Sequence, residues 1–154
     1  MSQEIYKTTA ARFIEKWQSM ERVYEAYAKS RGLTYMSFTV LGIIYDNPDC
    51  CTQKLICEQS LYTKQSVNAM VKSFWEQGYV VLKEERNDRR NKQVLFTKNG
   101  KRYADDIIGR FSLIEKQAMG KLSDEQWEQL IETAETFERH FVAGISELIK
   151  EMEK

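Results

Sequence analysis

Amide and ammonium side chains gather on one side of a helical segment near the middle of the chain. Spaced as in a helix, residues 63–77 divide into an apolar side and a polar side. The apolar side holds Val67, Met70, Val71 and Phe74, and the polar side holds Lys64, Gln65, Asn68 and Lys72. Gln, Asn and Lys hydrogen-bond base edges in a major groove, and Thr63 and Ser66 suit phosphate oxygens or base edges at the helix start. An ordinary surface helix that faces solvent has the same pattern. This segment alone therefore does not distinguish a DNA-recognition helix from a surface helix without that function.

A second cluster of polar residues follows and favours nucleic acid. Four cations crowd a short stretch with little apolar surface to pack, namely Arg86, Arg89, Arg90 and Lys92. A solvated loop rarely needs so much like charge, whereas the narrow minor groove of DNA has a strongly negative potential. We therefore expect this stretch to enter a minor groove.

These two groups of residues need elements that hold them side by side. Residues 52–59 and 63–77 are predicted to be two helices joined by Leu61 and Tyr62, with Thr63 as N-cap and Gly78 as the stop. Residues 79–84 and 92–97 are predicted to be antiparallel strands, with residues 85–91 as a charged tip. Two short helices followed by a charged hairpin form a winged helix-turn-helix.

Long helices are predicted on both sides of this unit. One covers residues 8–30, a second begins after Thr34, and two more cover residues 98–120 and the stretch that follows Ser123. The fold class is thus mainly α (α+β). The expected organisation is an N-terminal dimerisation helix in residues 1–32, a DNA-binding domain in 33–100 and C-terminal dimerisation helices in 101–154. Apolar stripes on the outer helices exceed what a monomer can cover, and such surfaces mark interfaces.

The charge distribution supports a polyanionic partner even though the net charge is zero. Residues 63–102 contain ten Lys or Arg against four Asp or Glu, a local charge of +6, and residues 123–154 contain three against nine, a local charge of −6. The N-terminal residues lack the apolar segment of a secretory signal, so a cytoplasmic location with reduced cysteines is expected.

Several motifs resemble the multiple antibiotic resistance regulator (MarR) family, over nearly the whole chain. Residues 88–100 resemble its wing signature, D-x-R, a short strand and L-T-x-x-G, with Phe96 in place of Leu. Gly32-Leu33-Thr34 resembles the G-L-T before the family's second helix, with Ser37 where Gln is common. Residues 55–78 resemble its helix-turn-helix, including an aromatic-x-x-x-Gly ending.

The resemblance implies a homodimer on a roughly palindromic operator, with the recognition helix in the major groove. It implies that Arg90 reaches the adjacent minor groove and that Asp88 orients Arg90. Repression by exclusion of polymerase, and release from DNA by a small aromatic or amphipathic effector, are further implications. Six residues could line an effector pocket or simply form core, namely Trp17, Met20, Tyr24, Tyr35, Phe38 and Phe111.

Other functions find less support in the residues. No catalytic constellation, cofactor-binding loop or metal-ligand set is recognisable, since His140 is far from the cysteines. A thiol-based redox sensor is an alternative that the cysteines favour less than a structural explanation, in which Cys57 is a small core residue and Cys50 and Cys51 are incidental. A winged domain that binds a protein partner is a second alternative, against which the basic hairpin argues.

Overall fold

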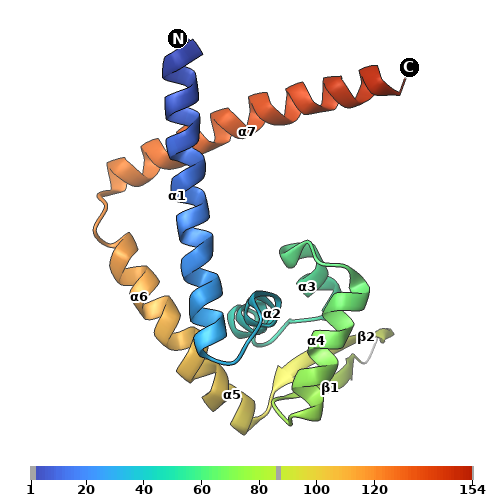
Figure 1. Cartoon of the computed structure of the whole chain (residues 1–154). Coiled ribbons are helices and arrows are strands. Elements are labelled where there is room, and N and C mark those ends of the chain that lie inside the picture. The colour runs from blue at the N-terminus through green and yellow to red at the C-terminus, as the bar shows by residue number, and fades with distance from the viewer. Residues whose placement is uncertain (1–2, 86–87, 154) are drawn as a thin grey trace. The chain divides into compact units, whose positions relative to one another are not determined.

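The computed structural model describes residues 3–85 and 88–153, with the side chains of residues 7–84 and 92–153 (Figure 1). The described chain divides into two compact units, residues 1–111 and 112–154. The elements run in the order α1 (Gln3–Ser30), α2 (Tyr35–Asp46), α3 (Gln53–Ser60), α4 (Lys64–Glu76), β1 (Val80–Glu85), β2 (Asp88–Phe96), α5 (Lys98–Ala104), the π-helical turn η1 (Asp105–Gly109), α6 (Arg110–Met119) and α7 (Asp124–Met152).

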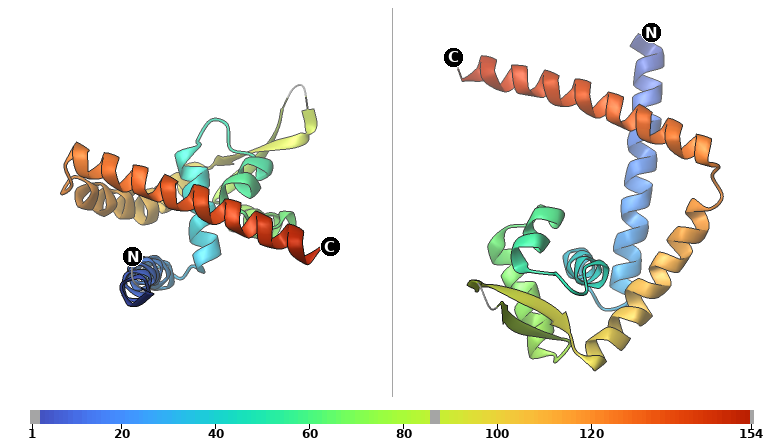
Figure 2. Two further views of the ribbon diagram at one scale, coloured as in Figure 1. Left: turned by 90° about the horizontal axis from the view of Figure 1, so that it is seen from above. Right: turned by 180° about the vertical axis from the view of Figure 1, so that it is seen from behind.

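The first unit is a winged helix-turn-helix, so the predicted fold class is confirmed. Helices α2, α3 and α4 enclose a core whose largest fully buried side chains include Leu41, Ile44 and Ile56. Strands β1 and β2 pair antiparallel, with Val80 opposite Phe96, and Val80 and Val94 close the core from the hairpin side. Beyond this contact the hairpin extends away from the helices (Figure 2, left).

The turn between α3 and α4 has an unusual backbone. Leu61 adopts a left-handed conformation with φ 58° and donates its N–H to the Cys57 carbonyl, which ends α3. Gly78 has φ 73° and ends the segment that follows α4, as the sequence predicts. These two positions set the exit directions of the helices that present the polar side chains.

Helix α1 has one apolar stripe, and its own unit covers only the C-terminal half of it. Ala28 is fully buried, and Tyr24 and Tyr27 pack against the core. The N-terminal half of the stripe is more than half exposed and comprises Phe13, Ile14, Trp17, Met20 and Val23.

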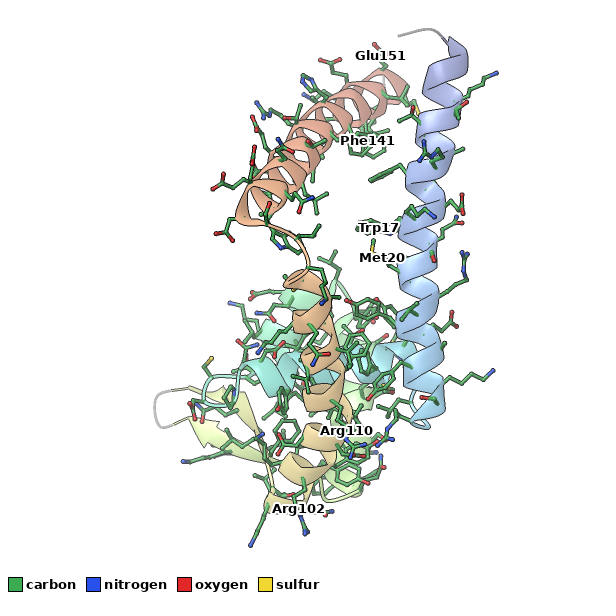
Figure 3. All side chains as sticks on the ribbon, turned by 90° about the vertical axis from the view of Figure 1, so that its left-hand side faces the viewer. Trp17, Met20, Arg102, Arg110, Phe141 and Glu151 are labelled. Carbon is green, nitrogen blue, oxygen red and sulfur yellow. The ribbon has the colours of Figure 1, made fainter. Side chains whose placement is uncertain are left out.

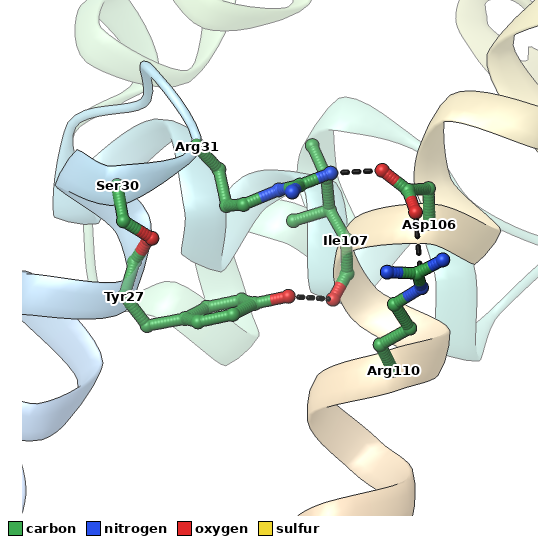
Figure 4. Close-up of polar contacts among 6 residues, drawn as sticks. All are labelled: Tyr27, Ser30, Arg31, Asp106, Ile107 and Arg110. Carbon is green, nitrogen blue, oxygen red and sulfur yellow. Dashed lines mark hydrogen bonds and ion pairs between the residues drawn. The ribbon is translucent and has the colours of Figure 1, made fainter.

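The end of α1 is tied to the π-helical turn by polar contacts (Figure 4). The Tyr27 hydroxyl donates to the Ile107 carbonyl at 2.8 Å. The Arg31 guanidinium pairs with Asp106, which also accepts from Arg110 Nε at 3.0 Å. One carboxylate thus receives two guanidinium groups, so α1, η1 and α6 are held together where the chain leaves the winged unit.

The second unit is dominated by α7, whose N-terminus has the predicted cap. The Ser123 hydroxyl accepts from Gln126 N–H, and Gln126 Oε1 accepts from Ser123 N–H at 2.9 Å, a reciprocal capping box. None of the α7 residues is buried. Its large apolar side chains, exposed in the described unit, are Leu130, Ile131, Phe137, Phe141, Val142, Ile145, Leu148, Ile149 and Met152.

Three details differ from the sequence prediction. Strand β2 begins at Asp88, so the predicted irregular tip over residues 85–91 was wrong for Asp88–Asn91, whose backbone is paired or strand-like. This stretch resembles a loop in sequence because all of its residues are polar, without the alternation of apolar and polar residues that indicates a strand. Helix α1 begins at Gln3, before the predicted start. The predicted helix over residues 98–120 contains the π-helical turn, which periodicity does not reveal.

Candidate nucleic-acid interface

Helix α4 is anchored on its apolar side and capped at its N-terminus. Val67, Val71 and Phe74 are buried in the core. The Thr63 hydroxyl accepts from Ser66 N–H at 3.2 Å, and the two hydroxyls lie 2.9 Å apart. The cap fixes the helix start, and the positive end of the helix dipole there favours an anion.

The opposite side of α4 presents the polar residues that the sequence singled out. Lys64, Gln65, Asn68 and Lys72 are all exposed. Lys72 Nζ is 3.6 Å from Glu76 Oε1, and both side chains are exposed. Because an exposed ion pair contributes little free energy, Lys72 can exchange Glu76 for another anion at low cost. The structure thus brings these side chains together on one surface.

The hairpin lies beside this surface, but only part of its charge can be placed. Lys92 is exposed and lies 3.7 Å from Glu84, its cross-strand partner. Arg86 lies outside the described residues, and so do the side chains of Asp88, Arg89 and Arg90. The roles expected for these four residues stay predictions.

The base of the hairpin is fixed through Thr97 and Gly100. The Thr97 hydroxyl donates to the Gly78 carbonyl at 2.7 Å and accepts from Gly100 N–H at 2.9 Å. Gly100 packs directly on the Tyr79 backbone, where a β-carbon would overlap the carbonyl oxygen. The T-x-x-G element of the wing signature therefore joins the hairpin to α5.

Helix α3 contributes two residues that the sequence analysis missed. Gln53 Nε2 donates to Asn68 Oδ1 over a long 3.5 Å, and Lys54 is exposed next to it. Both stand at the N-terminus of the first helix of the helix-turn-helix, the end that crosses the DNA backbone in such motifs. That general geometry was the signal that could have identified them.

Comparison with known proteins is consistent with this interface. A family model described as MarR family matches residues 31–91, which include the helix-turn-helix and most of the hairpin. The HTH-type transcriptional regulator SarZ of Staphylococcus epidermidis is 28% identical over 116 residues, which cover 74% of this chain and 75% of SarZ.

The winged helix-turn-helix of this chain is thus similar to that of the MarR family.

Two solved structures share the fold of this chain. A MarR family regulator from Neisseria meningitidis has a TM-score of 0.70 at 24% identity, over 96% of this chain and 99% of that one. MepR of S. aureus, in a structure described as a MepR–DNA complex, has a TM-score of 0.64 at 18% identity, over 86% and 96%. The family model and the similarity to SarZ support a DNA-binding transcription regulator.

The residues predicted to line an effector pocket divide into two groups. The rings of Tyr24, Phe38 and Phe111 pack on one another, with centroids 4.9 Å apart for Tyr24–Phe111 and 5.2 Å for Phe38–Phe111. Tyr35 meets Tyr24 edge-on at 6.5 Å. Trp17 and Met20 are each 56% exposed and project from α1 (Figure 3). The pocket stays a prediction.

The cysteines occupy three different environments. Cys51 is fully buried in the core, and burial raises the pKa of its thiol to about 12. Cys57, which one interpretation of the sequence placed in the core, packs against the core but is only partly buried. Cys50 is exposed. Among the described residues there is no group of three or more His, Cys, Asp or Glu that could hold a metal ion. In the same part of the chain, no helix is both long and apolar enough to cross a membrane.

Proposed function

We propose that this regulator acts as a homodimer that binds a roughly palindromic operator and represses transcription by excluding polymerase. The observation that carries the proposal is the exposed polar side of α4 next to a basic hairpin, both held on one rigid unit. Gln65 at the centre of that side suits hydrogen bonds to base edges in the major groove. The hairpin arginines, Arg90 above all, suit the adjacent minor groove.

Dimerisation is supported by apolar surface that each unit leaves uncovered. The N-terminal half of the α1 stripe and the whole α7 stripe consist of exposed large side chains. Surfaces of this size are rare on monomers and mark interfaces. A two-fold dimer would present two α4 helices to half-sites one helical turn of DNA apart, about 34 Å.

We also propose that a small effector releases the protein from DNA. The aromatic cluster of Tyr24, Tyr27, Phe38 and Phe111 connects α1, α2 and α6. A flat aromatic or amphipathic molecule that inserts among these rings would separate α1 from the winged unit and shift the spacing of the two recognition helices.

The test is fluorescence anisotropy with DNA from the protein's own upstream region, against scrambled DNA, across a salt series. We expect preference for the native fragment and an affinity that falls steeply as salt rises. Equal, weak binding of both fragments at every salt concentration would contradict the proposal. If specific binding is found, aromatic carboxylates and amphipathic cations titrated into the complex test effector release. If none of these compounds weakens DNA binding, the result contradicts release by an effector of these two classes.

A further inference from the structure

A hollow of about 590 Å³ lies between α3, the N-terminal half of α4 and the hairpin. Among the residues whose side chains the structure describes, its lining contains three lysines, Lys54 from α3, Lys64 from α4 and Lys92 from β2, and no acidic residue. The remaining lining residues are Gln53, Cys57, Asn68 and Leu82. Lysine side chains from three separate elements thus line one concave surface.

The walls of this hollow are fixed to one another. Val94 N–H donates to the Cys51 carbonyl at 2.8 Å, and Thr52 forms a bridge with Gln93, so the start of α3 is attached to β2. The Thr52 hydroxyl also caps α3 by accepting from Leu55 N–H at 3.1 Å. The long contact between Gln53 and Asn68 joins α3 to α4. The hollow is therefore a built feature of the winged unit.

Its lysines are available to an anion. Lys54 and Lys92 face Glu58 and Glu84 across 3.8 Å and 3.7 Å, and both pairs are exposed, which makes them weak. Within the part of the chain that the structure describes, Lys64 has no ion pair. A phosphate could replace the two glutamates without leaving a buried charge unpaired.

The position of the hollow decides which anion fits. With α4 in a major groove and the hairpin in the adjacent minor groove, one sugar-phosphate strand separates the two grooves and must cross the space between them. That space is the hollow. This argument rests on the proposed function, because it assumes that both elements engage the same duplex.

We infer that the hollow between α3, α4 and the hairpin seats the DNA backbone strand that separates the two grooves, with Lys54, Lys64 and Lys92 bound to its phosphates. Lys54 thereby becomes a DNA contact, and Lys64 neutralises phosphate instead of selecting bases. Base selection by α4 is then carried out by residues that do not line the hollow, chiefly Gln65.

The first experiment measures affinity against salt for Lys54→Gln and Lys64→Gln. Each variant should weaken native and scrambled DNA by the same factor, about fivefold to tenfold per protomer at 0.1 M salt, and should reduce the salt slope by about 0.9 per protomer. Lys29→Gln, an exposed lysine in the last turn of α1, is the matched control and should change neither quantity. Changed base preference with an unchanged slope would overturn the assignment of Lys64.

The second experiment uses Cys57 as a reporter inside the hollow and the exposed Cys50 as an internal control. The labelling of both thiols by N-ethylmaleimide is followed by mass spectrometry with and without DNA. Bound DNA should slow labelling of Cys57 at least tenfold and leave Cys50 little changed. Equal labelling of Cys57 in a complex proven to be formed would overturn the inference and leave the proposed function intact. Absence of any complex with the wild-type protein would instead contradict the proposed function.

Discussion

Gly100 and Tyr79 are in backbone contact where α5 leaves the hairpin. A β-carbon on Gly100 would overlap the Tyr79 carbonyl oxygen and lie 2.6 Å from the carbonyl carbon. That carbonyl also accepts from Thr97 N–H at 2.9 Å, so it cannot move away without loss of the bond that sets the hairpin base. The Tyr79 ring in turn stacks on Tyr103, with centroids 4.1 Å apart.

Gly100→Ala should therefore destabilise the winged unit by about 3 kcal/mol or more, as expected for strain that a packed site cannot relieve. Chemical denaturation followed by circular dichroism measures the change. Gly144→Ala in α7 is the matched control, because nothing lies within 4 Å of the added carbon. The control should be neutral or more stable by up to about 1 kcal/mol. Equal stabilities of the two variants would contradict the close contact.

Arg90→Ala should weaken operator binding by about 1–3 kcal/mol, since a guanidinium in a narrow minor groove meets a strongly negative potential. Anisotropy at matched salt gives the affinity. Arg102→Ala on α5, whose side chain donates to Asn99 at 3.4 Å, removes the same charge away from the hairpin and should have a smaller effect. An unchanged affinity for Arg90→Ala would show that the hairpin does not enter the groove.

Gln65→Ala should alter which operator bases are preferred, because loss of a bidentate amide contact costs about 1–3 kcal/mol of discrimination. Binding to a set of singly substituted operators measures this preference. Gln77→Ala, at the other end of α4, is the control, since Gln77 Nε2 already donates to the Ser73 carbonyl at 3.1 Å. An identical preference profile for Gln65→Ala and the wild type would rule out base recognition by Gln65.

Phe141→Glu, within the exposed stripe of α7, should raise the free energy of dimer formation by about 3 kcal/mol or more through burial of unpaired charge. Ala143→Glu adds the same charge two residues away, on the opposite side of the helix, and should leave the dimer intact. Sedimentation velocity over a concentration series distinguishes the two. A dimer that survives both substitutions would place the interface elsewhere.

Cys51 should make the free energy of unfolding decrease at alkaline pH. Its folded pKa is about 12 against an ordinary value of 9.0, chiefly because burial disfavours the thiolate, with a smaller contribution from Cys50. The folded state therefore holds a proton that the unfolded state releases, and stability falls as pH rises from about 9 towards 12.

The stability difference between the wild type and Cys51→Ala should accordingly shrink over that range, as measured by urea denaturation at each pH. Cys50→Ala serves as control for the removal of a neighbouring thiol, because Cys50 is exposed. If the stability difference between the wild type and Cys51→Ala stayed constant over this range, Cys51 would ionise at the same pH in the folded and the unfolded state, which would contradict the prediction.

The sequence by itself determined most of the secondary structure and the identity of the polar side of α4. Helical spacing separates Val67, Val71 and Phe74 from Lys64 and Gln65 without any knowledge of the fold, because one turn of helix brings residues three and four apart to one side. The caps at Thr63 and Ser123 were equally predictable, since they depend on residues within one turn.

Tertiary structure alone decided which distant residues meet. Lys54, Lys64 and Lys92 share one hollow only because β2 is bonded to the start of α3, a contact between residues more than 40 positions apart in sequence. The full burial of Cys51 likewise follows from how the hairpin packs on the start of α3, and the start of β2 at Asp88 follows from its pairing with Glu85 of β1. Local periodicity carries no information on such pairings, because they depend on the packing of separate elements.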